Sequence, residues 1–525
     1  MLKQSLKLQL ISGIILLAGL FSVLMMQNKP LGDYGNYYFG ARIAMSGENV
    51  LSEVYDSRSF NTHVQEAGER NFFLNHGTVT PQTILFYVPF ALIPGAILSK
   101  SVFGIVSLFV FVFAFIRFAS RYFPDPDWRT YLLTIAGLLT VHYNIQLGQS
   151  WLLVTALIMF AFLKSEESPV LSGLCFAMAI LLKLSPAFLL LILVSRRQWK
   201  PVLAAAAFIA LFTLVFGLLF NSGFEALNEF FSHSLMRISG GYFSDPYSSS
   251  FQSFIVLLRK LMVHDDVLNT TTWWSGSERT AQFINLIFTG ILMFLIAGSW
   301  NQKTGIFARV RILLLFLLLT SGYTSSYSFV IMLPFLFSKE NTLSLYKIGL
   351  YTIVFVAPPR LFDGTNPFLE EYKMWAMLAV FIAETVPVFS FRVIRLEQAV
   401  VAATLLIFFC LKSLNNPETL QMTYFKPDAI NSDYVTGAYI HNDSLNYMIN
   451  ENGTFKLKKL VMKPAFNGAE WISRNNEAYK LNHVNVILIA ERNEELLVLS
   501  DYRRGPGLFH LYSLPKTYFI RLKSE

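Results

Sequence analysis

Charged residues are scarce in this chain. Asp, Glu, Lys and Arg make up 14% of its 525 residues, whereas 54% are hydrophobic. Soluble domains carry about 25% charged residues, so the composition excludes an ordinary soluble protein. Apolar runs of about 20 residues, the length that crosses the hydrocarbon layer of a bilayer, recur along most of the chain. The pattern predicts an all-α polytopic membrane protein with about 12 spans.

Cysteine is almost absent as well, since Cys175 and Cys410 are the only two. Both lie in apolar segments and are expected to be small buried hydrophobes, which excludes a disulfide framework and a Cys-rich metal site. Gly-rich phosphate loops of the P-loop and Rossmann types are missing. Asp125 and Asp127 are interpreted as a solvated turn, and residues 264–266 lack a second carboxylate partner for a hard cation. We therefore predict no metal and no cofactor.

The positive charges indicate how the chain is oriented. In a membrane protein an excess of Lys and Arg, here a net charge of +8, marks cytoplasmic loops and does not indicate nucleic acid. Lys3 and Lys7 precede a first span at about 8–26, and no small-residue cleavage site follows it. We expect a multi-pass protein of the inner or plasma membrane with a cytoplasmic N-terminus and large external loops at 27–95 and 221–280.

One apolar segment is interrupted. Residues 169–200 begin and end beside charged turns, yet they are too few for two complete crossings. Lys183 lies in the middle and is followed by Pro186, which breaks helices. A re-entrant or broken helix pair fits this pattern, because irregular backbone at membrane depth must be buried or line a wet cavity. An intramembrane lysine is costly and is a functional candidate by default.

The composition changes after residue 412. Segments such as VNVILIAE and ELLVLSDY are typical of short strands bounded by turn residues. We predict a transmembrane domain over 1–412 and a small α/β or β-rich domain over 413–525, on the periplasmic or extracellular side.

The segment KPLGDYGNYYFGARIAMSG, from Lys29, places Asp33 directly after the first span. Two interfacial helices are expected in this loop, at 34–45 and 58–71. Asp33 has two compatible interpretations: an N-cap of the first helix, or a general base at the mouth of a cavity. Tyr37 and Tyr38 offer flat faces with polar edges, which suit sugar rings and the membrane interface alike.

Asp33, Tyr37, Ala41, Gly47 and Tyr55 have a spacing that resembles the first external loop of glycosyltransferase family 87. Other segments resemble further motifs of that family, in the same order along about residues 1–340: the proline-punctuated segment 80–94, Gly148-Gln149, Gly173 with Lys183 and Pro186, and Gln252-Ser253 with Arg259. Departures are present too. Trp151 stands where an asparagine is usual, and Gly322, Tyr327 and Ser328 stand where a proline and histidines are expected.

The resemblance implies a GT-C fold and an inverting transfer of mannose, or a similar hexose or pentose, from a polyprenyl phosphate carrier. The acceptor would be lipid-linked or a glycan on the outer membrane face, and membrane lipids would surround the protein. Asp33 would be the catalytic base. The residues expected at the donor phosphate are Lys183, Arg259, Arg237 and Arg42, and those expected at the substrate are Tyr37, Tyr38, Gln149, Gln252 and Tyr327.

Two other functions are alternatives. A transporter or flippase often shows internal repeats and charged residues in several spans, whereas this chain shows no repeat and places intramembrane charge almost only at Lys183. A polysaccharide polymerase or ligase would be expected to present more external arginines and histidines.

Overall fold

A computed structural model gives the fold of the chain. It describes residues 2–26, 31–55, 57–67, 74, 76, 79–123, 125–234, 247, 251–264, 269, 272–300, 304–322, 324–338, 343–356, 362 and 366–389, together with seven strands between 435 and 522.

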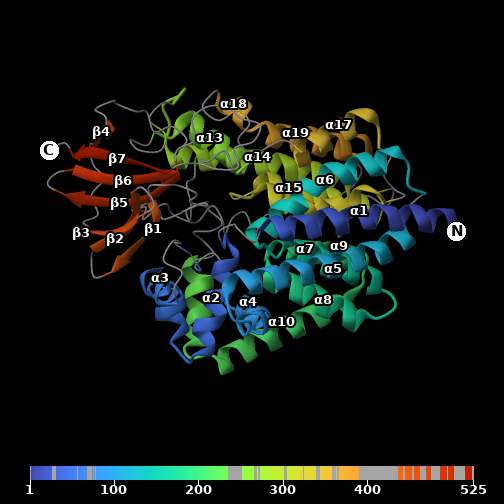
Figure 1. The fold of residues 1–525 in the computed structure, drawn as a ribbon. Helices are drawn as coiled ribbons and strands as arrows, with labels where there is room; N and C mark the ends of the chain where they lie inside the picture. Colours follow the sequence, from blue (N-terminus) through green and yellow to red (C-terminus); the bar gives the residue numbers. More distant parts are fainter. Residues whose placement is uncertain are drawn as a thin grey trace.

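The described part up to residue 389 is helical (Figure 1). Among the described residues, four helices are long and apolar enough to cross a membrane: α1 (Leu2–Met26), α5 (Ala96–Tyr122), α10 (Trp199–Leu219) and α14 (Glu278–Ser299). The shorter helices that matter below are α2 (Tyr34–Met45), α4 (Thr83–Ala91), α6 (Trp128–Leu147), α7 (Trp151–Lys164), α13 (Phe254–Met262), α15 (Ile306–Thr320), α17 (Leu345–Val356), α18 (Pro367–Glu370) and α19 (Tyr372–Thr385).

Several long helices turn apolar side chains outward. On α10, Leu203 and Leu218 are 66% and 71% exposed, although a soluble protein seldom exposes contiguous apolar surface of this kind. Lipid is the solvent that suits such a face, so the chain is a membrane protein. By length and composition, the described residues contain four spans, or up to five if α6 and α7 form one broken span. The expected total of about 12 spans stays a prediction.

A glycine corner connects α6 to α7. The helix pair is bent by 120° at this break, and Gly148 between the two helices has φ +65°, ψ +38°. This left-handed conformation ends a helix and favours glycine, which has no Cβ to clash. A Cβ on Gly148 would lie 2.4 Å from the Cβ of Tyr34. The corner therefore needs glycine, and it brings the next residue, Gln149, against α2.

The break predicted near Lys183 is present. Helix α8 (Pro169–Leu182) ends at Leu182, and Lys183 is extended, with φ −151° and ψ 124°. A 3-10 helix, η3 (Ser185–Leu189), and the short helix α9 (Leu190–Ser195) follow. Pro186 has no N–H to continue the helical ladder. The hydroxyl of Thr83 donates to the carbonyl of Leu181 at 2.9 Å, so one carbonyl at the broken end is satisfied by α4.

The loop after the first span, which is predicted to be external, folds against the helices. Helix α2 has the predicted bounds, whereas α3 (Ser57–Glu66) ends earlier than the predicted 58–71; residues 68–73 lie outside the described residues. A π-helix, η1 (Val50–Val54), follows α2. The remaining short elements of the helical part are α11 (Gly223–Glu229), η4 (Phe230–Ser234), η5 (Ser326–Met332), α16 (Leu333–Leu336) and η6 (Val386–Val388).

The strands form two antiparallel sheets, with the orders β1-β2-β3 and β4-β7-β6-β5. Their bounds are β1 (Val435–His441), β2 (Ser444–Glu451), β3 (Thr454–Val461), β4 (Ala469–Ser473), β5 (Asn485–Arg492), β6 (Glu495–Asp501) and β7 (Pro515–Leu522). The predicted division into domains 1–412 and 413–525 stays a prediction.

Candidate active site

Asp33 stands at the N-cap position of α2, but its carboxylate caps no backbone N–H. It accepts a hydrogen bond from the side-chain amide of Gln149 instead. Asp127 provides the contrast, because its Oδ1 accepts from the backbone N–H of Arg129 at 3.0 Å and of Thr130 at 3.2 Å, as a cap should. The N-cap interpretation of the Asp33 side chain is therefore wrong.

Asp33 is one end of a chain of hydrogen bonds. Tyr37 donates from its hydroxyl to Gln149 Oε1 at 3.2 Å, and Lys183 Nζ donates to the same hydroxyl at 3.0 Å. An ammonium is only a donor and an ionised carboxylate only an acceptor. Every bond from Lys183 through Tyr37 and Gln149 to Asp33 therefore runs in one direction. A cation and a carboxylate are fixed relative to each other by two neutral groups.

The other surroundings of Lys183 are aromatic. Its ammonium lies 5.6 Å from the ring centre of Tyr37 and 5.9 Å from that of Trp151, within the range of a cation–π contact. Within the described part of the chain, no carboxylate forms an ion pair with it. Trp151, which departs from the family pattern, thus supplies a face for this cation. A ligand anion would meet a lysine whose charge no protein carboxylate neutralises by contact.

The side chain of Tyr37 is buried, so its ring has no exposed face on which a sugar could stack. It is 3% exposed, and its ring stacks on Tyr87 with 4.5 Å between the ring centres. Burial raises the pKa of the Tyr37 hydroxyl, and the charge of Asp33 raises it further. Tyr37 therefore keeps its proton at neutral pH and can donate it to Gln149.

Two further groups lie near this chain of bonds. Lys100, on the first turns of α5, is buried, donates to the carbonyl of Gln146 and interacts electrostatically with Asp33. Sequence reasoning missed it, although a lysine inside an apolar span is a usable signal. Tyr327, in η5, interacts electrostatically with Lys183, and its carbonyl accepts from Asn144 Nδ2 at 2.7 Å. The predicted contact of Tyr327 with substrate stays a prediction.

The remaining predicted residues lie elsewhere. Arg42 is exposed and bonds the hydroxyl of Tyr38 at 2.8 Å, and that hydroxyl donates to the Ile93 carbonyl. Arg259 is 1% exposed and binds Glu278, with Nη2 2.7 Å from Oε1. Neither arginine is bonded to the Asp33 chain, so their role at a donor phosphate stays a prediction. Arg237 lies outside the described residues.

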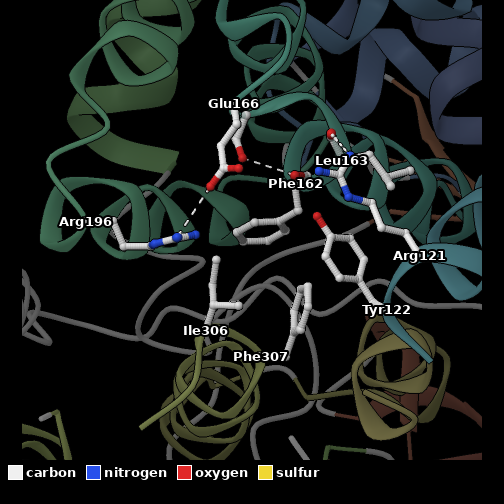
Figure 2. Close-up of a pocket in the computed structure, with 9 residues that line it drawn as sticks. Arg121, Tyr122, Phe162, Leu163, Glu166, Arg196, Ile306 and Phe307 are labelled. Carbon is white, nitrogen blue, oxygen red and sulfur yellow. Dashed lines mark hydrogen bonds and ion pairs between the residues drawn. The ribbon is translucent and has the colours of Figure 1, made fainter. Parts of the chain in front are cut away.

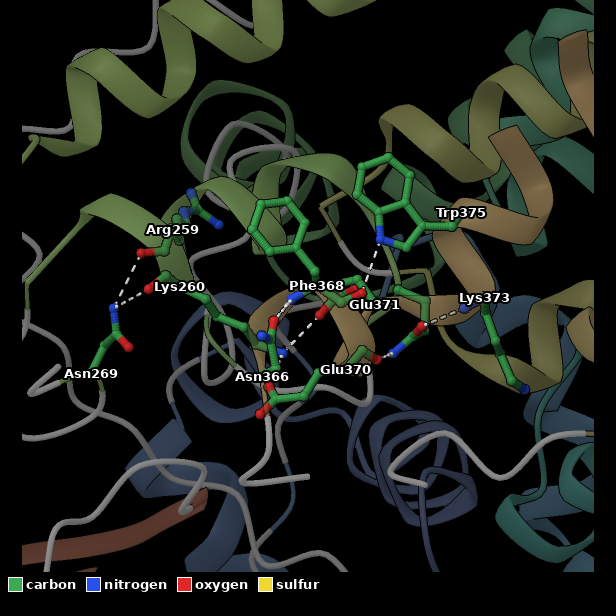
Figure 3. Close-up of polar contacts among 10 residues, drawn as sticks. Arg259, Lys260, Asn269, Asn366, Phe368, Glu370, Glu371, Lys373 and Trp375 are labelled. Atoms are coloured by element: carbon green, nitrogen blue, oxygen red, sulfur yellow. Dashed lines mark hydrogen bonds and ion pairs between the residues drawn. The ribbon is translucent and has the colours of Figure 1, made fainter. Parts of the chain in front are cut away.

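Gln252, in the predicted external loop 221–280, connects this segment to α19. Its Nε2 donates to the carbonyl of Glu370 at 2.8 Å, and its Oε1 accepts from the backbone N–H of Lys373 at 3.1 Å. Its own N–H donates to the carbonyl of Thr324. Figure 3 shows the polar contacts around this junction. Gln252 therefore positions two segments here, and its predicted contact with substrate stays a prediction.

A cavity of about 200 Å³ lies at another place in the fold (Figure 2). Ion pairs border it: Arg196 lies 3.4 Å from Glu166, and Arg121 binds Glu167. None of the predicted site residues lines this cavity, so it is not the candidate active site. Among the described residues, no group of three or more His, Cys, Asp or Glu side chains could hold a metal ion.

Comparison with known proteins supplies one match. The sequence model described as Glycosyltransferase family 87 matches residues 78–322. This segment contains Gln149, Lys183 and Arg259, whereas Asp33 precedes it and Tyr327 follows it. No curated protein and no solved structure matches the chain.

Proposed function

From the premise that residues 78–322 belong to glycosyltransferase family 87, and that the chain is therefore a membrane glycosyltransferase, we propose its reaction. The enzyme moves one sugar, mannose or a similar hexose or pentose, from a polyprenyl phosphate carrier to a hydroxyl of a lipid-linked or glycan acceptor. The transfer takes place at the outer membrane face and inverts the anomeric centre.

The observation that carries the proposal is the state of the Asp33 carboxylate. The carboxylate accepts no hydrogen bond from the N-terminus of α2, and one of its oxygens accepts a hydrogen bond from Gln149. The described residues give the other oxygen no partner. A general base must be fixed in place and still have an oxygen lone pair for the proton it removes. Asp33 meets both needs, and the bonds through Gln149 and Tyr37 tie it to a cation at Lys183.

The chemistry follows from the two ends of this arrangement. Asp33 takes the proton of the acceptor hydroxyl, and the acceptor oxygen forms a bond to the anomeric carbon. The bond between that carbon and the phosphate oxygen breaks, and its electron pair stays on the phosphate. Lys183 stabilises the negative charge that develops there, the kind of stabilisation that fixed donors provide to a transition state. Attack from the face opposite the phosphate gives inversion.

A contact made by Lys7 supports the orientation in the membrane that we propose from the basic loops. Lys7, before the first span, binds Asp125 at 2.6 Å and the carbonyl of Pro126 at 3.1 Å. Both partners lie in the loop between α5 and α6, which the charge pattern also assigns to the cytoplasm. A contact between two segments assigned to the same side supports a cytoplasmic N-terminus, with Asp33 beyond the other end of α1.

A reconstituted transfer assay tests the function. The purified protein, in proteoliposomes with a polyprenyl-phosphate hexose or pentose, should move the sugar to a lipid-linked or glycan acceptor. NMR of the product should show the anomeric configuration opposite to that of the donor. Retention of configuration would overturn the single-displacement mechanism. Transfer that proceeds from a nucleotide sugar, and not from the lipid-linked donor, would overturn the proposed donor class.

A further inference from the structure

A fully buried lysine lies in the first turn of α19. Lys373 is 0% exposed, and the carboxylates of two preceding residues, Glu370 and Glu371, are turned to a different cation. Both bind Lys260, at 2.8 Å and 2.7 Å (Figure 3). The acidic neighbours in the sequence thus form their ion pairs across to α13. Within the described residues, Lys373 has no ion pair.

Lys373 has a different partner. Its Nζ donates to the hydroxyl oxygen of Ser326 at 3.0 Å and lies 5.4 Å from the ring centre of Phe329. Burying a cation without an anion is costly, by several kcal/mol even after the surroundings relax. Such a lysine gives up its proton unless a ligand supplies a counter-ion. The position of Ser326 indicates which ligand.

The direction of this hydrogen bond leaves Ser326 with a proton to donate. An ammonium has no acceptor, so the Ser326 oxygen must accept from Lys373. The serine O–H then needs another acceptor, and the described residues provide none for it. A hydroxyl whose oxygen is bonded to a cation is also a stronger donor, because hydrogen bonds in a series polarise one another. Such a group is suited to an anionic oxygen.

Ser326 also lies beside the candidate active site. It precedes Tyr327, which interacts electrostatically with Lys183. Lys183 and Lys373 therefore act on consecutive residues of the segment where the family pattern expects histidines. Lys183 directly follows α8 and Lys373 lies in α19, so the two lysines are far apart in the sequence, and both lack an ion pair with a described carboxylate.

We propose that the hydroxyl of Ser326, with Lys373 behind it, is a second anion subsite that binds the phosphate of the lipid carrier together with Lys183. This inference rests on the proposed function. Lys373 is a positioning residue, since it acts through Ser326, and Ser326 is the group that touches the phosphate.

Inhibition by carrier lipids measures the proposed contact between Ser326 and the carrier phosphate. Bare polyprenyl phosphate and the uncharged polyprenol of the same length are tested as inhibitors of sugar transfer by the wild-type protein and the variants Ser326→Ala, Lys373→Met and Lys373→Arg. Ser328→Ala is the matched control, because the Ser328 hydroxyl donates to the backbone carbonyl of Ser325 at 2.5 Å within the same segment. Thermal midpoints in detergent are measured for all proteins, to identify variants that fail to fold.

The expected result is a loss of affinity that depends on the phosphate. Ser326→Ala and Lys373→Met should each raise the inhibition constant of polyprenyl phosphate and the donor KM by about tenfold or more, the effect of losing a hydrogen bond to a charged group. Their inhibition constants for polyprenol should not change. The double variant Ser326→Ala/Lys373→Met should have the same inhibition constant for polyprenyl phosphate as either single variant, because the two residues act as a unit. Lys373→Arg should recover part of the affinity, and Ser328→Ala should match the wild type.

Two outcomes would overturn the subsite. Folded Ser326→Ala and Lys373→Met proteins that bind polyprenyl phosphate as the wild type does would show that the pair is only structural, while the proposed function would stand. The second outcome concerns the wild-type protein. If it transfers no sugar from a polyprenyl-phosphate donor and binds polyprenyl phosphate no more tightly than polyprenol, the proposed function and the subsite are both overturned.

Discussion

Gln149 donates a hydrogen bond to the carboxylate of Asp33, across 116 residues of sequence. The contact depends on the corner at Gly148, which ends α6 in a left-handed conformation and turns the next residue toward α2. The same glutamine accepts from Tyr37, which Lys183 bonds in turn. One amide therefore fixes the position of the proposed base relative to the proposed phosphate-binding cation.

Replacing Tyr37 by Phe should lower kcat while the fold is retained. The variant keeps the ring stacked on Tyr87 but loses the hydroxyl that connects Lys183 to Gln149. We expect kcat to fall about tenfold, the effect of a hydrogen bond worth about 1.4 kcal/mol. Tyr34→Phe is the control, since the Tyr34 hydroxyl bonds Ser99 and should affect only stability. Equal kcat values for the two variants would show that the Tyr37 link does not contribute to catalysis.

Tyr37 and Gln149 should also behave as a coupled pair. Gln149→Leu removes both the donor to Asp33 and the acceptor for Tyr37, so adding Tyr37→Phe should cause little further loss. A double-mutant cycle on kcat/KM would measure this, and we expect a coupling energy of about 1 kcal/mol or more. Additive effects of the two changes would mean that the hydrogen bonds observed here do not act together during turnover.

Gly148→Ala should destabilise the protein and reduce activity. Alanine at φ +65° costs about 1–2 kcal/mol, and its Cβ would lie 2.4 Å from Tyr34 Cβ. We expect a loss of about 2 kcal/mol or more, seen as a lower thermal midpoint in detergent. Gly290→Ala is the control, because Gly290 lies within α14 with nothing within 4 Å of its added Cβ, and alanine favours a helix. A midpoint for Gly148→Ala equal to that of the wild type would contradict the close packing of this corner.

His76 should make the loop that follows α1 sensitive to acid. It is buried and donates from Nδ1 to the carbonyl of Asn36 at 2.7 Å, and burial lowers the pKa of His76 from 6.5 to about 4. Because the unfolded chain binds the proton at a higher pH, stability is intact above pH 6.5 and falls as the pH decreases from 6.5 toward 4. The full effect corresponds to about 3 kcal/mol.

The measurement for His76 is the thermal midpoint at pH 7 and pH 5. The wild-type protein should lose more stability between these values than His76→Gln, which has no group that titrates there. Identical pH dependence of the two proteins would show that His76 takes up its proton without unfolding the loop.

Local patterns predicted the parts of the fold that depend on local chemistry. The predicted bounds 34–45 of α2, directly after Gly32 and Asp33, are confirmed, and the predicted break at Lys183 agrees with Pro186, four residues beyond the end of α8. The prediction of Asp33, Gln149 and Lys183 as site residues rests on the order of the motifs, and for Lys183 also on its place within an apolar segment. No spacing rule could place Gln149 against Asp33, because that contact depends on how α6, α7 and α2 pack.

The ion pairs of the buried lysines and arginines could not be predicted from the sequence, because several carboxylates are possible partners for each cation. Arg259 is predicted at the donor phosphate, a role that stays a prediction, and the structure gives it Glu278 at the start of α14 as an ion-pair partner. Lys373 follows two glutamates in the sequence and would be taken for their partner. The helix geometry sends both carboxylates to Lys260 and leaves Lys373 to Ser326. Which cation keeps its charge for a ligand is a property of the tertiary structure.

The most direct test of the account compares Asp33→Asn with Asp127→Asn in the reconstituted transfer assay. Asparagine preserves the shape at both positions and still caps α6 at Asp127, but it cannot accept the acceptor's proton at Asp33. We predict that Asp33→Asn lowers kcat by about 100-fold or more, the contribution of a general base, with an unchanged thermal midpoint, while Asp127→Asn stays close to the wild type. An Asp33→Asn protein that transfers sugar at the wild-type rate would contradict the assignment of Asp33 as the base.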